Sequence, residues 1–479
     1  MANSGKSNRK WIWLIVILIL VGVSGYVLWS RLLREEPLVY ESSLDNFKYG
    51  SIGTEKDGLR VPFWIWLVLP RMFPEYLPGP GGYVSLGFAW EEGKELPIGL
   101  PKRTIGQPMV GINCALCHTA TVRENRYEKP TIYVGAPAHQ FDTQGYFRFL
   151  FACASDPRFN ADNILTQLAP VYKLGFIDRL LYRYILIPQT KKGLLEFKQS
   201  MAWMDSRPAW GRGRIDPFNP AKFRYLGVPM DNSIANTDME SVWNMKTRVD
   251  HGYVYHWDGL LHGPLRDVVL SSALGDSVTP KTLPLADLKR VEDWLLNAPV
   301  PRYPFPVDQA LASRGAPLYQ SHCAECHAVG GARTGKVIPI TEVGTDRHRL
   351  DSWTQEAADH YNAYAANYPW KFNNFQKTNG YTAVLLDGVW LRAPYLHNGS
   401  VPTLTELLEP VESRPKQFWA GYDVYDKEKV GFVANGEDAQ RFGSELDVNV
   451  PGNSNSGHLW GTTLTPDEKR ALVEYLKTL

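Results

Sequence analysis

The chain has 479 residues, of which 44% are hydrophobic and 21% are charged, and its formal net charge at pH 7 is +1. This length and composition allow two or three buried cores. Because lysines and arginines are spread along the chain instead of forming blocks, we expect no nucleic-acid partner.

The first element in the chain is an uncharged apolar segment at residues 11–29, which basic residues precede. As a helix it would rise about 28 Å, enough to cross the hydrocarbon core of a bilayer. A cleaved secretory signal is the alternative, with a weak small-residue cleavage site at residues 23–25. The apolar run continues beyond that site as far as Trp29, so we predict an uncleaved membrane anchor over residues 1–34.

A second apolar run, at residues 61–70, is too short to span a bilayer. Its two tryptophans, Trp64 and Trp66, would suit a membrane interface. Ten apolar residues bounded by prolines more often form a core helix, which is the prediction here. A cluster of prolines and glycines at residues 78–82 then marks a turn.

Two copies of a Cys-x-x-Cys-His motif stand at residues 114–118 and 323–327. The two thiols of such a motif are spaced to add across the vinyl groups of a haem, and the histidine binds the iron from one face. A zinc site would need four ligands and a redox dithiol a thioredoxin-like context, and neither explains the histidine in both copies. We therefore predict two covalently bound haem c groups, with the residues Cys114, Cys117 and His118 at the first and Cys323, Cys326 and His327 at the second.

The predicted cofactor also bears on location and on the fifth cysteine. Haem c is attached outside the bacterial cytoplasmic membrane, so we expect one crossing of the bacterial cytoplasmic (inner) membrane with the bulk of the chain in the periplasm. Cys153 has no partner among the motif cysteines, and a buried apolar role is expected for it.

The segment from His118 to about residue 285 is rich in Trp, Tyr, Pro and Arg. It is too long for a loop, so we expect a large loop-rich insertion packed around the first haem. Its arginines Arg207, Arg212 and Arg214 are candidates to pair with haem propionates, or are ordinary surface arginines.

Apolar residues at spacings of three and four predict an amphipathic helix over residues 285–297. Prolines between residues 299 and 306 end it and form a stiff linker. This linker divides a first haem c domain, residues 35–300, from a second cytochrome c domain, residues 301–479.

The second domain begins with a predicted helix at residues 307–319, which leads to the second motif. It closes with a helix that Thr465 caps, with Pro466 in the first turn and Glu468 completing a capping box.

The pattern Gly315, Tyr319 and Cys323, closed at the far end by residues 474–476, resembles a cytochrome c domain, in which the first and last helices cross beside the haem. The helix containing residues 292–295 resembles the closing helix of an earlier copy. The resemblance implies a mainly α fold with two cytochrome c-like domains in tandem, the first with a large loop-rich insertion, behind an N-terminal transmembrane helix.

Two further stretches narrow the resemblance. Residues 257–259 (WDG) are similar to the Trp-Asp-Gly of bacterial di-haem cytochrome c peroxidases, and residues 393–400 (APYLHNGS) to a segment of their second domain. Residues 395–402 and 429–432 resemble more closely the branch that contains the di-haem rubber oxygenases. The resemblance covers roughly residues 105–479, rests on short motifs, and implies that Trp257 lies between the haems as an electron bridge. A buried structural tryptophan is the alternative.

The sixth ligand of the second haem departs from the peroxidases. No methionine follows Met245, and Val411 stands at the place where the peroxidases carry their methionine ligand. Of the downstream histidines, only His397 lies in a stretch that approaches the haem by resemblance, so we expect it to be the sixth ligand, the alternative being a hydrogen bond to the turn at residues 398–399. Without methionine this haem should have a low potential and supply electrons.

Four histidines could bind the far side of the first iron, and no spacing selects one of them: His139, His251, His256 and His262. An open iron would meet peroxide or dioxygen, and a closed one would only carry electrons. Asp267 stands where the peroxidases carry a glutamine that handles peroxide, and it takes the catalytic place by resemblance.

These observations predict a membrane-anchored periplasmic di-haem cytochrome c. Electrons from a small redox protein or a membrane electron donor would pass from the second haem through Trp257 to the first, where hydrogen peroxide would be reduced. The alternatives are a haem-dependent oxygenase that uses dioxygen at the first haem on an apolar substrate, and a non-catalytic electron-transfer cytochrome of a membrane complex.

Overall fold

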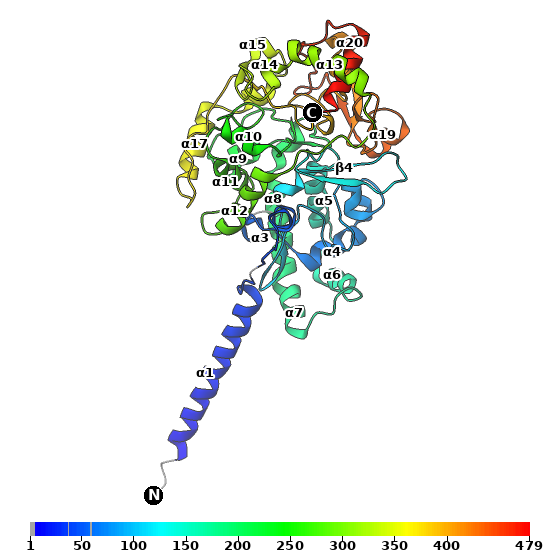
Figure 1. Cartoon of the computed structure of the whole chain (residues 1–479). Helices are drawn as coiled ribbons and strands as arrows, with labels where there is room; N and C mark the ends of the chain where they lie inside the picture. The colour runs from blue at the N-terminus through cyan, green and yellow to red at the C-terminus, as the bar shows by residue number, and fades with distance from the viewer. Residues whose placement is uncertain (1–4, 37, 58–59) are drawn as a thin grey trace.

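The computed structural model describes residues 5–36, 38–57 and 60–479, and in these ranges one long helix projects from a mainly helical body (Figure 1). The described α-helices are α1 (Gly5–Leu32), α2 (Ser43–Tyr49), α3 (Thr54–Asp57), α4 (Phe63–Met72), α5 (Thr143–Ser155), α6 (Ala161–Leu168), α7 (Phe176–Leu181), α8 (Ile187–Ser200), α9 (Asn219–Arg224), α10 (Met245–Asp250), α11 (Leu265–Gly275), α12 (Leu285–Asn297), α13 (Gln309–His322), α14 (Ala324–His327), α15 (Ile340–Val343), α16 (His348–Ser352), α17 (Gln355–Ala365), α18 (Leu404–Leu407), α19 (Glu437–Phe442) and α20 (Pro466–Leu476).

The strands are short and form small antiparallel sheets of two or three members. The described strands are β1 (Val61–Pro62), β2 (Lys102–Ile105), β3 (Gln107–Val110), β4 (Thr119–Val122), β5 (Thr131–Val134), β6 (Arg214–Ile215), β7 (Thr237–Asp238), β8 (Val337–Pro339), β9 (Gly380–Thr382), β10 (Gln417–Ala420), β11 (Tyr425–Asp426), β12 (Gly431–Phe432) and β13 (Ser444–Asp447). Two of these pairs position the haem motifs: β4 follows the first motif directly and pairs with β5, while β8 follows the second motif and pairs with β9.

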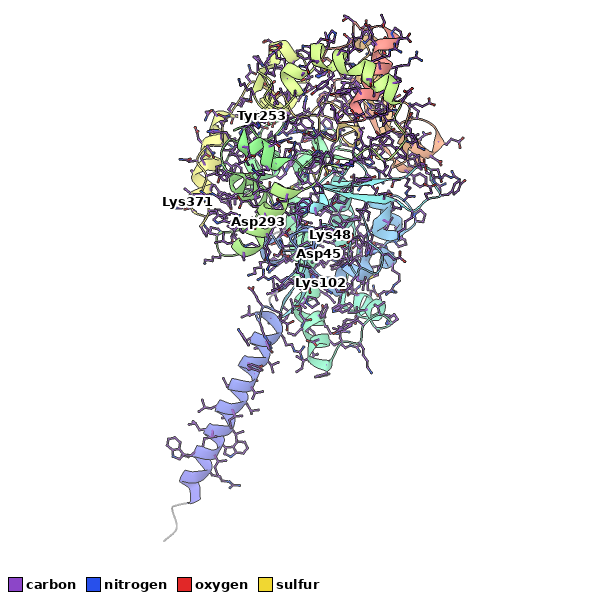
Figure 2. The ribbon with its side chains drawn as sticks, in the orientation of Figure 1. Asp45, Lys48, Lys102, Tyr253, Asp293 and Lys371 are labelled. Atoms are coloured by element: carbon purple, nitrogen blue, oxygen red, sulfur yellow. The ribbon has the colours of Figure 1, made fainter. Side chains whose placement is uncertain are left out.

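Helix α1 is long and apolar enough over Arg9–Leu32 to cross a membrane, and none of its apolar window is buried. Its side chains stand clear of the body, whereas charged pairs such as Asp45 and Lys48 lie within it (Figure 2). The helix ends where the chain reaches the body, and the backbone N–H of Gly106 donates to the Arg34 carbonyl at 2.7 Å. These features are consistent with the predicted membrane anchor.

Two large cores fill the body. The first combines α4, α5 and parts of α6 and α8, and α4 buries Phe63, Ile65 and Trp66, as the prediction of a core helix at residues 61–70 required. Cys153 of α5 is fully buried in this core, which confirms the apolar role expected for it. The second core contains residues of both predicted domains, among them Trp294 and Leu472, so the domain boundary at residue 300 stays a prediction.

The terminal helices of the predicted second domain cross at close range. Helix α13 passes α20 so closely that a Cβ added at Gly315 would lie 2.0 Å from the carbonyl oxygen of Ala471. Helix α20 begins with the predicted capping box, in which the Thr465 backbone N–H donates to a carboxylate oxygen of Glu468 at 2.8 Å. The crossing of first and last helices expected of a cytochrome c domain is thus present, and α12 has the predicted bounds.

Candidate haem sites

The first motif lies on a short 3-10 turn, Cys114–Leu116, immediately before β4. Asn113 caps this turn, and its side-chain oxygen accepts a hydrogen bond from the Ala115 N–H at 3.0 Å. The ring of His118 is then held by a contact of 2.7 Å between its Nδ1 and the carbonyl oxygen of Glu240. A carbonyl can only accept, so Nδ1 carries the proton and Nε2 keeps a lone pair for a metal.

A cavity of about 1170 Å³ opens beside Cys114, Cys117 and His118. This exceeds the ~300–1,000 Å³ typical of sites for small ligands, so a group as large as haem can be accommodated. Helices α11 and α12 supply much of an apolar wall, whose members include Leu260, Leu265, Val269, Leu295, Trp353 and Phe375.

Arg248 is a buried cation in the wall of this cavity. It is 7% exposed, and among the described residues its guanidinium makes no hydrogen bond or direct ion pair, while the carboxyls of Glu240 and Asp387 act on it from a longer distance. Burial lowers the pKa of Arg248, because the charged form loses solvation. Buried charges are paired in stable proteins, and a haem propionate is an acceptor of the right charge. The unpaired arginine therefore fits a propionate-bearing cofactor.

The arginines singled out in the sequence have other roles. Both nitrogens of Arg212 donate to backbone carbonyls, of Gln140 and Ser85, at 2.7 Å each. Arg214 is buried and donates to the Asn453 side chain at 2.7 Å. Arg207 binds backbone carbonyls of residues 231 and 233. These three arginines therefore cross-link segments of the chain near the two motifs. The candidate partner for a propionate is Arg248.

The second motif repeats the arrangement of the first. Cys323 ends α13, and α14 carries Cys326 and His327. The Nδ1 of His327 lies 2.6 Å from the carbonyl oxygen of Val384, so its Nε2 is again left for a metal. In both motif histidines a backbone carbonyl from a distant segment thus holds Nδ1 and leaves Nε2 available to a metal.

His458 faces His327. The centroids of the two imidazole rings are 6.3 Å apart with planes tilted by 44°. Two metal–nitrogen bonds of about 2.0 Å and the two ring radii would add up to such a separation. Burial is the main cause, and the neighbouring His327 the second, that lowers the pKa of His458 to about 4. The ring is therefore neutral at pH 7, as a metal ligand must be. The pair has the spacing of two axial ligands.

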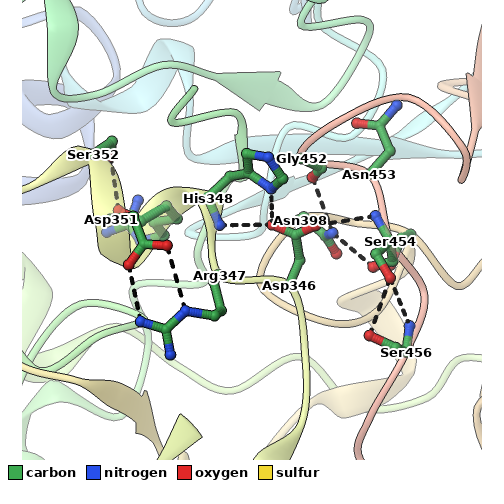
Figure 3. A network of polar contacts seen from close by, with 12 residues as sticks. Asp346, Arg347, His348, Asp351, Ser352, Asn398, Gly452, Asn453, Ser454 and Ser456 are labelled. Atoms are coloured by element: carbon green, nitrogen blue, oxygen red, sulfur yellow. Dashed lines mark hydrogen bonds and ion pairs between the residues drawn. The ribbon is translucent and has the colours of Figure 1, made fainter. Parts of the chain in front are cut away.

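A polar network fixes the segment that carries His458 (Figure 3). The Asn398 side chain donates to the carbonyls of Gly452 and Ser454 at 3.1 and 3.0 Å, and the Ser454 N–H donates to Asp346. Arg414, which is 2% exposed, donates to the Asn455 carbonyl at 2.6 Å and to the carbonyl of His458 itself at 3.2 Å. The position of His458 is therefore set by several long-range contacts.

His397, the residue expected as the sixth ligand, has a different environment. Its Nε2 lies 2.9 Å from the hydroxyl of Tyr381, and the two rings stack with centroids 3.9 Å apart. Its carbonyl accepts a hydrogen bond from the Asp238 N–H at 2.8 Å. Ligation by His397 stays a prediction, and the contact with Tyr381 occupies its Nε2, while its neighbour Asn398 holds the segment of His458. Sequence reasoning missed His458, whose presence among the downstream histidines was its sole signal.

Trp257 lies between the segments that hold the two motif histidines. Its indole N–H donates to the Asp238 carbonyl at 2.9 Å, and its backbone N–H donates to the Glu240 carboxylate at 3.0 Å. Its carbonyl accepts from the Thr382 N–H at 2.7 Å. Glu240 holds His118, and Val384, two residues after Thr382, holds His327. The backbone of Trp257 thus bridges the segment of Glu240 and the segment of Thr382 and Val384, while its indole bonds the segment of Asp238.

Asp267 does not line the cavity. Its neighbours Leu265 and Val268 on α11 do, and successive helical residues are turned by about 100°, which directs Asp267 to another side. Its Oδ1 lies 3.6 Å from Nε of Arg266, and burial raises its pKa. The catalytic role of Asp267 stays a prediction without a cavity contact. Several carboxyls do line the cavity, among them Asp216, Glu240 and Asp276. Burial raises the pKa of Asp276, at the end of α11, to about 7.

The four histidines considered for the far side of the first iron are separated by the fold. His139 is buried against Phe432 and bonds the Thr121 carbonyl at 2.9 Å. His256 lines the cavity, and its Nε2 is buried without a hydrogen-bond partner among the described residues. Neither His251 nor His262 lines the cavity. In the described part of the chain no ring faces His118 at the separation that joins His327 and His458.

Known protein families and curated proteins are similar to parts of this chain. Residues 380–420, which contain Val384 and His397, match a family described as RoxA-like, cytochrome c-like. This stretch is similar to part of a cytochrome c-like domain. Such a domain implies haem c binding, and the free thiols and oriented histidines fit that cofactor.

Two curated relatives from Sinorhizobium fredii (strain NBRC 101917 / NGR234) are also similar. The uncharacterized protein y4iM is 31% identical over 289 residues, which cover 50% of this chain and 64% of that protein. The uncharacterized protein y4iJ is 46% identical over 116 residues, which cover 22% of this chain and 19% of that protein. The chain thus spans less than two thirds of the length of either relative.

Proposed function

We propose that this protein is a membrane-anchored di-haem cytochrome c oxidoreductase, with α1 in the bacterial cytoplasmic membrane and the body in the periplasm. The two Cys-x-x-Cys-His motifs, each with a histidine held by a backbone carbonyl, support two haems in tandem cytochrome c-like domains. A haem supplies a redox-active iron, which carries electrons when both axial positions are filled and reacts with peroxide or dioxygen when one is open.

The second site is the electron-transfer site of this proposal. His327 and His458 would both hold the second haem through neutral nitrogens, and two nitrogen ligands would favour the ferric state relative to a methionine-ligated iron. In this proposal the indole of Trp257 carries electrons to the first site, and its backbone hydrogen bonds to Glu240 and Thr382 hold it between the two motif segments. The electron donor would be a small redox protein or a membrane component.

The first site is the reaction site of this proposal, and hydrogen peroxide is the oxidant. Its reduction to two waters takes two electrons, which the second site and Trp257 would deliver, and two protons. Of the titratable side chains in the cavity wall, His256 and Asp276 would supply the protons, His256 through an Nε2 that has no hydrogen-bond partner among the described residues.

A haem-dependent oxygenase that uses dioxygen on an apolar substrate is the second candidate function. The apolar wall and the volume of the first cavity favour it, as does the match to a RoxA-like family. A purely electron-transferring cytochrome of a membrane complex is the remaining alternative, and it requires a second ligand at the first iron.

The observation that carries the proposal is the contrast between the sites. The His458 ring lies 6.3 Å from the ring of His327, whereas among the described residues no ring contacts His118, and His256 is the cavity histidine near enough to lower its pKa. The test is the electronic spectrum of the purified protein, oxidised and half-reduced, with and without cyanide. We expect a high-spin band from one haem that cyanide shifts. Two low-spin haems that ignore cyanide would eliminate both enzyme candidates and leave the carrier. Peroxide turnover with a reduced donor, against oxygen uptake with a polyisoprene, then separates the two enzymes.

A further inference from the structure

An apolar tip projects from the body at the start of the long α7–α8 helix. It consists of exposed large side chains at Val171, Tyr172, Phe176, Ile177, Leu180 and Tyr184. Phe176 is 78% exposed and Tyr184 is 70% exposed, although both are aromatic. Phe176, Leu180 and Tyr184 are spaced by four residues, which places them on one side of the helix. A contiguous exposed apolar face of this kind indicates a contact surface.

The apolar tip lies beside the upper end of α1. Arg31, in the last turn of α1, forms an ion pair of 3.2 Å with Asp178, which is in α7. Figure 1 shows α7 reaching down from the body next to the end of α1, on the side of the body from which α1 leaves. If α1 crosses a bilayer, the tip is therefore at the level where that bilayer begins.

Charge at the apolar tip suits a phospholipid surface. Lys173 and Arg179 are exposed and have no ion pair among the residues that the structure describes. Interfacial helices combine aromatic and aliphatic side chains that enter the headgroup region with basic residues that bind anionic headgroups. A soluble partner protein would not explain why this face adjoins the predicted span.

We propose that the apolar tip inserts into the headgroup and upper acyl region of the same bilayer that α1 crosses. This inference rests on the membrane anchor of the proposed function. It gives the body two attachments to the membrane and so a fixed orientation. The exposed Gln189 and Gly193 of α8 line the first cavity, and Gln189 is about 8 Å along the helix from Tyr184, so the cavity would open close to the lipid.

The experiment uses the full haem-loaded chain in nanodiscs of phosphatidylethanolamine and phosphatidylglycerol, with a nitroxide label on one introduced thiol. The variants are Phe176→Cys in the apolar tip, Leu20→Cys in the middle of α1, and Phe442→Cys as the control. Phe442 is 43% exposed in α19, which lies on the opposite part of the body from α1 (Figure 1). The remaining native thiol outside the motifs, Cys153, is fully buried and will not be labelled. All three positions are exposed, and an unchanged haem spectrum verifies each fold.

Power saturation compares collisions of the label with oxygen, which partitions into lipid, and with a water-soluble nickel complex. We expect oxygen to dominate at positions 20 and 176 and the nickel complex at position 442. If the label at position 176 behaves like the label at position 442 while position 20 is in lipid, insertion of the apolar tip is refuted and the membrane anchor stands. Shielding from both reagents at position 176 in detergent and in nanodiscs indicates a protein partner or a second copy, and overturns it too. If the nickel complex reaches the label at position 20, both the membrane anchor and the insertion of the apolar tip are refuted.

Discussion

The close crossing of α13 and α20 gives a quantitative test of the cytochrome c-like domain. A Cβ at Gly315 would lie 2.0 Å from the Ala471 carbonyl oxygen and 2.8 Å from Cβ of Tyr475. Because the first of these atoms belongs to the backbone of α20, no side-chain rotation relieves the clash. The substitution Gly315→Ala therefore has to push the two helices apart.

Overpacking of this kind costs about 1–3 kcal/mol. Alanine recovers up to about 1 kcal/mol through its higher helix propensity. Since the clash is with the backbone, we expect a net loss in the free energy of unfolding of about 2 kcal/mol. In a domain of the predicted size this corresponds to a fall in Tm of roughly 4–8 °C.

Thermal unfolding of the haem-loaded chain in detergent, followed by far-ultraviolet circular dichroism and by the haem absorption, measures this change. Gly193 in α8 is the matched control, because a Cβ there meets no atom within 4 Å. We expect Gly193→Ala to leave Tm unchanged or to raise it. A Gly315→Ala variant that is as stable as the parent would show that α13 and α20 do not cross as described.

Three further predictions concern the haem sites. The variant His458→Ala should convert one haem from low to high spin in the ferric spectrum, whereas His397→Ala should not; the opposite pattern would restore His397 as the ligand. Replacing Arg248 by Leu should remove the partner of a propionate of the first haem, which would broaden the absorption band of that haem and lower the Tm of the haem-loaded protein. The Arg207→Leu control should keep the band. A gain in stability in the Arg248 variant would mean that no propionate pairs with Arg248. In Trp257→Leu, electron transfer between the haems after rapid mixing with reductant should slow by at least tenfold, and an unchanged rate would assign Trp257 to structure alone.

Local sequence patterns predicted the elements whose determinants are local. The apolar spacing of residues 285–297 and the capping box of Thr465 and Glu468 lie within single helices, and both appear as expected. The two motifs were recognisable because thiol and imidazole ligands must stand a fixed number of residues apart.

The partners of those motifs come from far along the chain, and no local pattern marks them. The carbonyl that holds His118 is 122 residues away, and the one that holds His327 is 57 residues away. His458 is positioned by Asn398 and Arg414 through contacts over at least 41 residues. The same holds for Arg248, which is notable because its charge is buried without a direct ion pair in the part of the chain that the structure describes, a property that the sequence does not contain.

The central claim is that two haems are covalently attached, one at each motif. Intact mass spectrometry of the protein purified from a host that matures haem c, under denaturing conditions, tests it directly. We predict a gain equal to two haem groups, of which one is lost in a Cys114→Ser, Cys117→Ser variant and the other in a Cys323→Ser, Cys326→Ser variant. A mass equal to that of the polypeptide alone would contradict the claim.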